Sequence, residues 1–470
     1  MNGMISFIPE IFTLFASMSI LMLGLIKKAA AKIHLFSITF SIILFALTII
    51  IQNTEAIYIF DKTLKFDTST AFFKQICILL FIIIILVSNQ FLIDKKIQRA
   101  EFYSLLFLSL LGTLLLISSE NLIMIFLGIE LTALCLYSMI ALSKNNILSY
   151  EAAIKYFVLS IIASGLLLFG FSFLYGISSS LNLSDILNDQ LYFENLSIYF
   201  FSYILIFVGI AFKFAAAPFH MWLPDIYEGS PYIVTTFISS IPKIGIFYIA
   251  FRFLDNNLIM LNDLFLYFLM SIGLFSIALG NIFALSQTKV MRLLAYSGIA
   301  NAGFIFLGIF VSSNSSFYVP AFYIIIYSIS SVGIISILSV LSSKGFNIVY
   351  INDLKGFVNN SVFLSLSFLI ILLSLAGIPF TAGFYAKYII FNELISREFF
   401  VVALIAIIFT AIGLYYYLRI IWFIYFEDGF STLYNVKNPI SNFVIFLIPI
   451  IIIILFLIPD LLLDRLIAIL

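Results

Sequence analysis

About fourteen apolar runs, each about twenty residues long, follow one another along this chain. A helix of that length crosses the hydrocarbon core of a bilayer and satisfies all of its own backbone hydrogen bonds there. The runs lack the polar–apolar alternation of a membrane β-barrel. We therefore predict an all-α polytopic membrane protein, one membrane domain over 1–470, with about 14 transmembrane helices. The predicted spans are 8–26, 33–52, 72–92, 102–119, 122–142, 151–176, 198–218, 231–252, 263–285, 292–312, 317–342, 362–393, 399–424 and 441–463.

Composition excludes several other classes of protein. Charged residues make up 10% of the chain and hydrophobic residues 63%, whereas soluble domains carry about a quarter charged residues. The 23 basic residues are balanced by 23 acidic ones, so no basic surface for nucleic acid is expected. Cys77 and Cys135 form neither a CxxC motif nor a disulfide framework, and no glycine-rich phosphate loop is present. We expect no metal, no cofactor and no redox centre in this chain.

The distribution of basic residues predicts the orientation of the spans. The loops after odd-numbered spans hold Lys27, Lys28, Lys32, Lys95, Lys96, Arg99, Lys144, Lys289, Arg292, Lys344, Lys355, Arg419 and Lys437. The opposite side holds fewer basic residues, namely Lys62, Lys65, Arg252, Arg397 and Arg465. Because cytoplasmic loops carry an excess of lysine and arginine, we expect both termini on the outer side of the membrane.

The five remaining lysines lie within predicted spans, at Lys74, Lys155, Lys213, Lys243 and Lys387. A charge in the bilayer interior costs several kcal/mol, so such residues usually mark routes for ions or protons. Lys74 is near the start of its span, where it can extend to the interface. Lys155 follows Glu151 by one helical turn. A local ion pair between them explains these two charges as well as a role in a proton route does.

Glu130 and Lys243 occupy the middle of their spans. Glu130 is flanked by apolar residues on both sides, and its alternative role is a structural hydrogen bond between helices. Lys243 directly follows Pro242, which removes a backbone donor and bends a helix. A bent helix offers a polar pocket for an ammonium group, although a purely structural role stays open.

Two lysines lie beside Pro-Phe dipeptides that we expect to break their helices. Lys213 precedes Pro218, and Lys387 follows Pro379. Transporters place ion sites at such broken helices, often in two inverted repeats. We therefore predict two inverted five-helix repeats, formed by spans 4–8 and 9–13, with broken helices 7 and 12. The alternative is that the two Pro-Phe breaks coincide by chance. His220 titrates near neutral pH, and packing is an equal explanation for it.

The stretch AFKFAAAPFHMWLPDIYEGSP (211–231) resembles the signature of the antiporter-like subunits of respiratory complex I, and its tail is shared with Mrp-type cation/proton antiporters. Further segments resemble the subunit N family of bacterial NADH–quinone oxidoreductase. They are EFYSLLFLSLLGTLLLISSENLIMIFLGIEL (101–131), EAAIKYFVLS (151–160), QTKVMRLLAYSGIANAGF (287–304), AGIPFTAGFYAKYIIF (376–391) and YYYLRI (415–420). The resemblance divides the chain into N-terminal spans 1–3 (1–100), a first antiporter-like repeat (101–253), a second one (263–424) and a C-terminal span (441–470).

The resemblance implies a multi-pass subunit of a bacterial inner (plasma) membrane complex, with periplasmic termini. It implies a proton channel in this chain, whereas NADH, FMN, iron–sulfur clusters and quinone react in other subunits. Partners would be the other membrane subunits, the peripheral arm and lipid. In the family's proton route, Glu130 and Lys213 would be the coupled pair, Lys243 the central relay and Lys387 the residue near the exit. The residues at positions of secondary importance would be Glu101, Glu151, Lys155 and His220.

One departure from the family concerns Asn301 in SGIANAGF, where relatives often carry a histidine. Asparagine does not titrate, so a relay step there needs water instead. Two other functions stay open. An Mrp-type sodium/proton antiporter subunit would use the same lysines, and a scaffold would use the charges as structural pairs. Lysines within five spans are costly for a scaffold.

Overall fold

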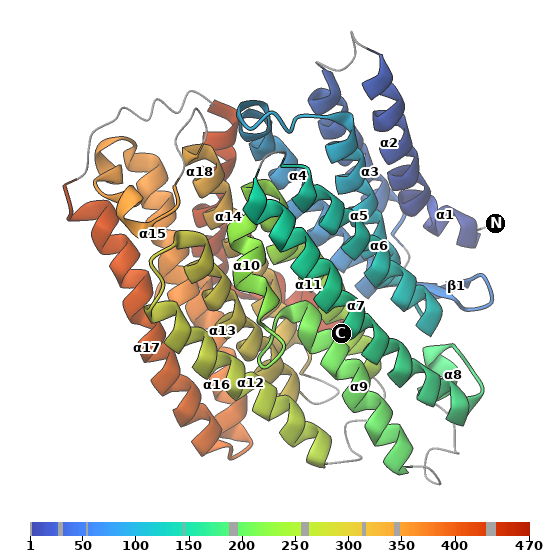
Figure 1. Ribbon diagram of the computed structural model, residues 1–470. Helices are drawn as coiled ribbons and strands as arrows, with labels where there is room; N and C mark the ends of the chain where they lie inside the picture. Colours follow the sequence, from blue (N-terminus) through green and yellow to red (C-terminus); the bar gives the residue numbers. More distant parts are fainter. Residues whose placement is uncertain are drawn as a thin grey trace. The chain divides into compact units, whose positions relative to one another are not determined.

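The computed structural model describes residues 2–26, 32–52, 55–143, 146–187, 196–254, 263–312, 316–342, 348–428 and 439–470. Within these residues, 13 helices are long and apolar enough to cross a membrane. They are α2 (Ile8–Leu25), α3 (Ile33–Ile50), α4 (Thr68–Asp94), α5 (Ala100–Ser118), α6 (Leu122–Ala141), α7 (Ile147–Ser178), α9 (Leu196–Phe214), α11 (Tyr232–Leu254), α12 (Asp263–Leu285), α13 (Val290–Val311), α14 (Tyr318–Leu341), α17 (Phe400–Tyr425) and α18 (Pro439–Leu457) (Figure 1). The protein is an all-α polytopic membrane protein, as predicted.

The predicted span 362–393 is a broken helix, which also agrees with the sequence. It consists of α15 (Val362–Ala376) and α16 (Ala382–Ser396). The predicted seventh span is interrupted as well, because α9 ends at Phe214 and α10 (Trp222–Gly229) follows after a turn. Each predicted repeat thus contains one broken helix. The inversion of the repeats and the division of the chain at 1–100, 101–253, 263–424 and 441–470 stay predictions.

The chain forms two compact units. The first contains Met1–Ile85, Ile97–Phe214 and Ile241–Leu266, and the second contains Leu86–Lys96, Ala215–Ser240 and Tyr267–Leu470. In the first unit, α5 packs against both α2 and α6, and α7 packs against α9. The α5–α6 contact depends on small residues, because a Cβ on Gly128 would lie 3.0 Å from the carbonyl oxygen of Gly112. Small residues allow such close backbone approach in membranes.

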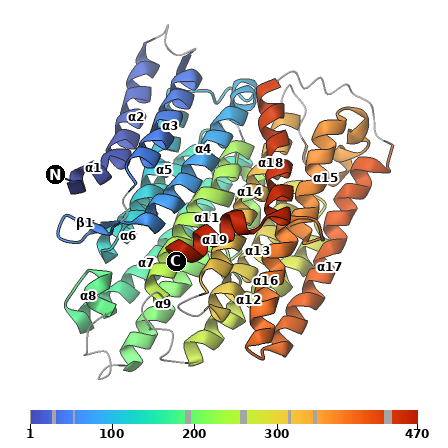
Figure 2. The same cartoon turned by 180° about the vertical axis from the view of Figure 1, so that it is seen from behind.

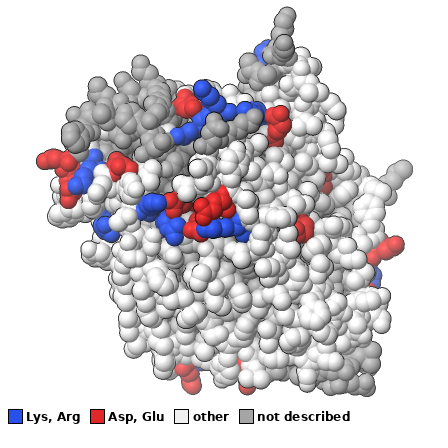
Figure 3. Space-filling view, in the orientation of Figure 1, with Lys and Arg blue, Asp and Glu red and all other residues white. Residues whose placement is uncertain are grey.

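The second unit has a buried centre and an apolar periphery. In both α13 and α14, 94% of the apolar stretch that could cross the membrane is buried inside the protein. In α17 and α18 the buried share of that stretch is only 33%. Since the exposed residues of α17 and α18 are apolar, these helices suit contact with lipid tails. The short helix α19 (Asp460–Ile469) packs across α14 (Figure 2). On the face shown in Figure 3, charged side chains of both signs gather in a few mixed patches, and wide areas between them carry no charge.

The connections between the spans contain structure that the sequence did not predict. Within 53–71, the strands β1 (Ile57–Ile59) and β2 (Leu64–Phe66) form an antiparallel hairpin. Short helices α1 (Asn2–Ser6) and α8 (Leu183–Leu187) and two 3₁₀ turns, η4 (Ile351–Leu354) and η5 (Phe357–Asn359), complete the described elements. Three-residue strands are too short to give a periodic signal, so this hairpin escaped prediction.

Two basic residues form buried ion pairs that the sequence did not predict. Lys74 does not extend to the interface: it is 3% exposed and forms an ion pair with Glu10. Arg252, the last residue of the predicted span 231–252, lies in the last turn of α11, where it is buried and paired with Glu120. In both cases a carboxylate from a distant part of the chain provides a partner inside the protein. Of the residues that predicted the orientation, Lys27, Lys28, Lys144, Lys344 and Lys437 fall outside the described residues.

Asp67 joins the hairpin to α4. Its Oδ1 accepts hydrogen bonds from the Thr70 amide and the Ser69 hydroxyl, each at 2.8 Å, and its Oδ2 lies 3.1 Å from Nζ of Lys65. Burial alone would raise the pKa of Asp67, but Lys65 and these hydrogen bonds stabilise the carboxylate and lower its pKa from 3.8 to about 2.

We expect Asp67→Ala to loosen the hairpin and the first turn of α4. The pKa difference corresponds to about 2 kcal/mol, which is about a thirtyfold change in local opening. Because the folded-state pKa is the lower one, this stability is complete above about pH 4 and is lost as the pH falls towards 2. Amide hydrogen exchange over residues 57–71 measures the effect.

Asp67→Asn is the matched variant, because it keeps an acceptor for the helix cap but removes the charge. Its exchange rates should differ from those of the unmodified protein at pH 6, and this difference should shrink at pH 3. A difference that stays the same at both values would contradict the role of the charge.

Candidate functional site

The break between α15 and α16 positions Lys387. The helix α15 ends with Gly377 at φ +82°, and the amides of Gly377 and Ile378 both donate to the carbonyl of Leu373. Glycine is favoured there because side chains make this backbone conformation costly. The neighbouring carbonyls of Leu375 and Ala376 receive the Lys387 ammonium, each at 3.0 Å from Nζ. The broken helix therefore supplies Lys387 with hydrogen-bond acceptors, which the lipid interior lacks.

The ammonium of Lys387 has further favourable surroundings. The carboxyl end of a helix carries partial negative charge, and the ring of Phe304 lies 5.1 Å from Nζ. Hydrogen bonds to a charged group contribute about 1.5–3 kcal/mol each, so two of them offset much of a burial cost of several kcal/mol. Lys387 is only 9% exposed. Among the residues that the structure describes, two backbone carbonyls and no carboxylate hold this buried ammonium group.

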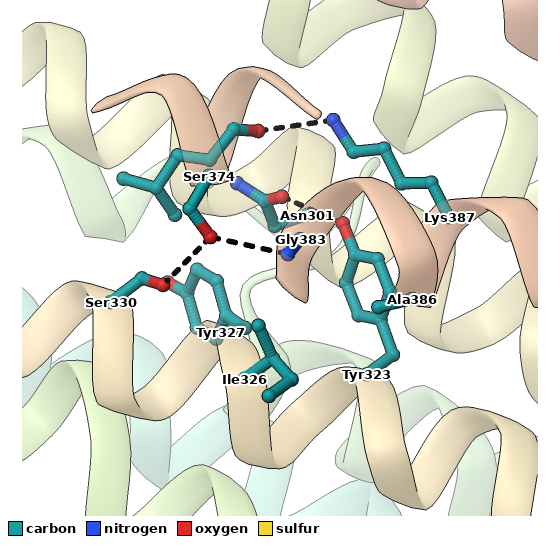
Figure 4. A pocket seen from close by; sticks show the side chains of 10 residues that line it. Asn301, Tyr323, Ile326, Tyr327, Ser330, Ser374, Gly383, Ala386 and Lys387 are labelled. Atoms are coloured by element: carbon teal, nitrogen blue, oxygen red, sulfur yellow. Dashed lines mark hydrogen bonds between the residues drawn. The ribbon is translucent and has the colours of Figure 1, made fainter. Parts of the chain in front are cut away.

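Polar side chains from α13, α14 and α15 meet beside Lys387 (Figure 4). The Tyr323 hydroxyl donates to Oδ1 of Asn301 at 2.7 Å, and the Ser374 hydroxyl lies 3.5 Å from that of Ser330. Two small cavities, each of about 10 Å³, border Lys387 and Asn301. That volume admits one water molecule in a polar site. The structure therefore offers space for water where the sequence lacks a titratable group at Asn301.

The second cavity also reaches α12 and α17. Its lining includes Asn281, whose Oδ1 accepts a hydrogen bond from the Tyr416 hydroxyl at 3.1 Å. Sequence reasoning missed both residues. The available signal was an asparagine in the otherwise apolar segment SIALGNIFAL (276–285).

Lys213 and Glu130 both meet helix α7 in the first unit. Nζ of Lys213 on α9 donates to the Ser160 hydroxyl at 2.6 Å, and the Ser164 hydroxyl donates to Glu130 on α6. Ser160 and Ser164 are four residues apart and share one face of α7. The sequence predicted Glu130 and Lys213 as a coupled pair, and the structure brings them to this shared pair of serines. The signal that sequence reasoning missed is the serine spacing in LSIIASG (159–165).

Lys243 and His220 are both buried. Lys243 is 2% exposed, and α11 continues through Pro242 without interruption. His220 lies in the turn before α10 and is 6% exposed. Among the described residues, none forms a hydrogen bond with its Nδ1. In the same turn, the amide of Ala217 donates to the Ser276 hydroxyl at 2.8 Å, which satisfies a backbone group that the break leaves without a helical partner.

The remaining candidates lie near the surface. Glu101 is exposed at the start of α5. Glu151 and Lys155 form an ion pair of 2.7 Å along α7, with side chains 51% and 41% exposed. An exposed pair of this kind contributes little stability, about 0.3–0.5 kcal/mol.

The acidic residues of the 211–231 stretch hold α10 against α13. Arg292 lies 2.7 Å from Asp225 and 3.0 Å from Glu228, and Lys289 also pairs with Glu228. Because α10 and α13 both belong to the second unit, these contacts hold the half-helix after the break in place within that unit. Across the described ranges, no group of three or more His, Cys, Asp or Glu side chains is placed to hold a metal ion.

Broken helices that form ion sites near the middle of the membrane are typical of one class of proteins, the membrane transporters. The model of the NADH:quinone oxidoreductase/Mrp antiporter transmembrane family matches residues 119–413. NADH-quinone oxidoreductase subunit N of Ruthia magnifica subsp. Calyptogena magnifica is 36% identical over 427 residues, which is 90% of this chain and 88% of the relative. The chain belongs to the NADH:quinone oxidoreductase/Mrp antiporter membrane family, and the relative from Ruthia magnifica carries the name of a subunit N.

Solved structures agree with this membership. A chain of respiratory complex I from Thermus thermophilus with bound aureothin has a TM-score of 0.83 and 26% identity, with 97% of this chain and 99% of that chain covered. A chain of the Mrp complex from Dietzia sp. DQ12-45-1b has a TM-score of 0.83 and 16% identity, with 98% of this chain and 96% of that chain covered. The second likeness concerns the fold alone.

We expect Gly383→Ala to disturb the joint between α15 and α16. A Cβ at this position would lie 1.9 Å from the carbonyl oxygen of Ser374, so the two half-helices would have to separate. Overpacking of this kind costs about 1–3 kcal/mol. The thermal midpoint of the purified protein in detergent should fall. Gly176→Ala is the control, because a Cβ there meets nothing within 4 Å; equal midpoints for the two variants would contradict the close contact.

Proposed function

We propose that this chain is the proton-translocating membrane subunit of an NADH–quinone oxidoreductase. The observation that carries the proposal is the Lys387 site, where a broken helix presents backbone carbonyls to a buried ammonium beside two water-sized cavities. Such a site holds a proton inside the membrane and gives it a neighbouring path through water. Relatives at 36% identity carry the name of subunit N, which supports the assignment to this complex.

In the proposed mechanism, protons move between buried side chains. Lys213 and Glu130 form one exchanging pair, and the hydroxyls of Ser160 and Ser164 between them pass protons along the face of α7. A hydroxyl both donates and accepts a hydrogen bond, so it suits such a transfer. Lys243 serves as the central relay and Lys387 as the residue near the exit. His220, Glu101, Glu151 and Lys155 take secondary roles.

The electron transfer is proposed to occur in partner subunits. NADH, FMN, iron–sulfur clusters and quinone would be bound there, and this chain would hold no cofactor of its own. The partners would be the other membrane subunits and the peripheral arm, in a bacterial inner membrane with the termini of this chain on the periplasmic side. The coupling then requires that conformational changes in the partners alter the contacts of the buried lysines.

A sodium/proton antiporter subunit of the Mrp type is the second candidate, because the Mrp complex shares the fold. The two functions differ in their driving reaction. Sodium-dependent proton exchange in vesicles that contain only this chain would favour the antiporter. Proton uptake that requires NADH and the other subunits would favour the oxidoreductase.

We expect Lys213→Ala and Lys213→Arg both to lower NADH-driven proton uptake in reconstituted liposomes. Alanine removes the exchanging group, and arginine keeps the charge but does not release its proton. A positioned acid or base accelerates proton transfer by about 10²–10⁴-fold, so the loss should be at least on the order of tenfold. The amount of assembled complex should stay unchanged.

Arg465→Ala is the control for the loss of a basic group, because Arg465 is exposed on α19. It should pump at the normal rate. A fully assembled Lys213→Arg complex with unaltered proton uptake would contradict the relay, because a purely structural cation tolerates this replacement.

A further inference from the structure

A buried ion pair lies in the first unit, in helices outside the proposed relay. Nζ of Lys74 on α4 lies 2.5 Å from Oε1 of Glu10 on α2, and the two side chains are 4% and 0% exposed. The Ser118 hydroxyl at the end of α5 donates to the same Oε1 at 3.2 Å. Three helices therefore contribute one polar group each to this buried site.

The carboxylate of Glu10 has an unused position. Among the residues that the structure describes, none donates a hydrogen bond to its buried Oε2. Buried carboxylate oxygens are nearly always satisfied, so an unpaired one indicates a bound proton or a water molecule. The ring of Phe66 lies 4.3 Å from Nζ of Lys74 and shields the other side of the pair. Glu10 is thus held at a point where a proton can be added.

A second pair follows on the same segment. Two residues after Ser118, the carboxylate of Glu120 forms a buried ion pair with Arg252. The β1–β2 hairpin covers this segment, because Leu64 pairs with Ser119 and the Glu120 amide donates to the carbonyl of Thr63 at 2.9 Å. Buried charges therefore continue from the Glu10–Lys74 pair to the hairpin end of the unit.

Stability alone is a weak reason for such a pair. Desolvation of two charges costs several kcal/mol per ion, and apolar residues of similar size are often as stable or more stable. Proton exchange requires both the lysine and the carboxylate. A contact that only fills space does not require either charged group. The unused oxygen, the adjoining hydroxyl and the second pair all suit exchange.

We propose that Glu10 and Lys74 form a proton-exchanging pair that passes protons through Ser118 towards the hairpin end of the first unit. The Lys74 ammonium gives a proton to the Glu10 carboxylate, which leaves a neutral amine and a carboxylic acid. The acid releases the proton through the Ser118 hydroxyl to a water molecule, which becomes a hydronium ion, and the neutral amine takes a proton from a second hydronium ion. The pair returns to its starting state with one proton moved. This inference rests on the proposed function of the chain as a proton-translocating subunit.

The test compares Glu10→Gln and the double variant Glu10→Leu/Lys74→Met in the whole complex, reconstituted into liposomes. The measured quantity is the rate of NADH-driven proton uptake at equal content of assembled complex. We expect both to lose uptake on the order of tenfold, because neither can exchange a proton at this site. Glu55→Gln, an exposed residue before β1, is the matched control and should pump normally.

The double variant separates exchange from a structural role. It removes the buried charges together, so a purely structural pair should be replaced without loss. Normal proton uptake by the double variant would overturn the inference, and so would failure of that variant to assemble, because the pair would then be needed for the fold.

Lys213→Ala, measured in parallel, separates this inference from the proposed function. Normal proton pumping by the Lys213→Ala complex would contradict the proposed function itself. Loss of pumping in Lys213→Ala with normal pumping in both Glu10 variants would remove only the role of Glu10 and Lys74.

Discussion

An ammonium group inside a membrane protein must find oxygen atoms within the protein, and the architecture of this chain follows from that requirement. A regular helix uses nearly all of its own carbonyls, so it has none to offer to a lysine. Breaking α15 at Gly377 frees the carbonyls of Leu375 and Ala376, and both accept hydrogen bonds from Lys387. The break is therefore a condition for burying this lysine.

The first unit meets the same requirement in another way. Lys213 contacts the Ser160 hydroxyl, and Ser164 one turn away contacts Glu130. The two solutions differ chemically, since a backbone carbonyl only accepts a hydrogen bond, whereas a hydroxyl also donates one. The α7 serines can therefore transfer a proton between a base and an acid, while the carbonyls near Lys387 can only hold the charge. In the proposed relay, proton transfer at Lys387 would depend on water in the small cavities beside Asn301.

The sequence predicted the helices well because each span carries its own apolar signal. It also predicted the break near Pro379, since proline and glycine act locally. It failed for contacts that join distant segments. Nothing near Lys74 indicates that Glu10 will meet it, and nothing near Arg252 indicates Glu120. The hairpin at Ile57–Phe66 escaped for a related reason, because its strands depend on the segment that they cover rather than on their own periodicity.

The most direct test of the account is affinity purification of the tagged chain from native membranes in mild detergent, followed by an assay of NADH–quinone reductase activity. We expect the activity to co-purify with the chain, and the purified material to take up protons in liposomes when NADH is supplied. A chain that purifies without this activity and exchanges sodium for protons would contradict the account.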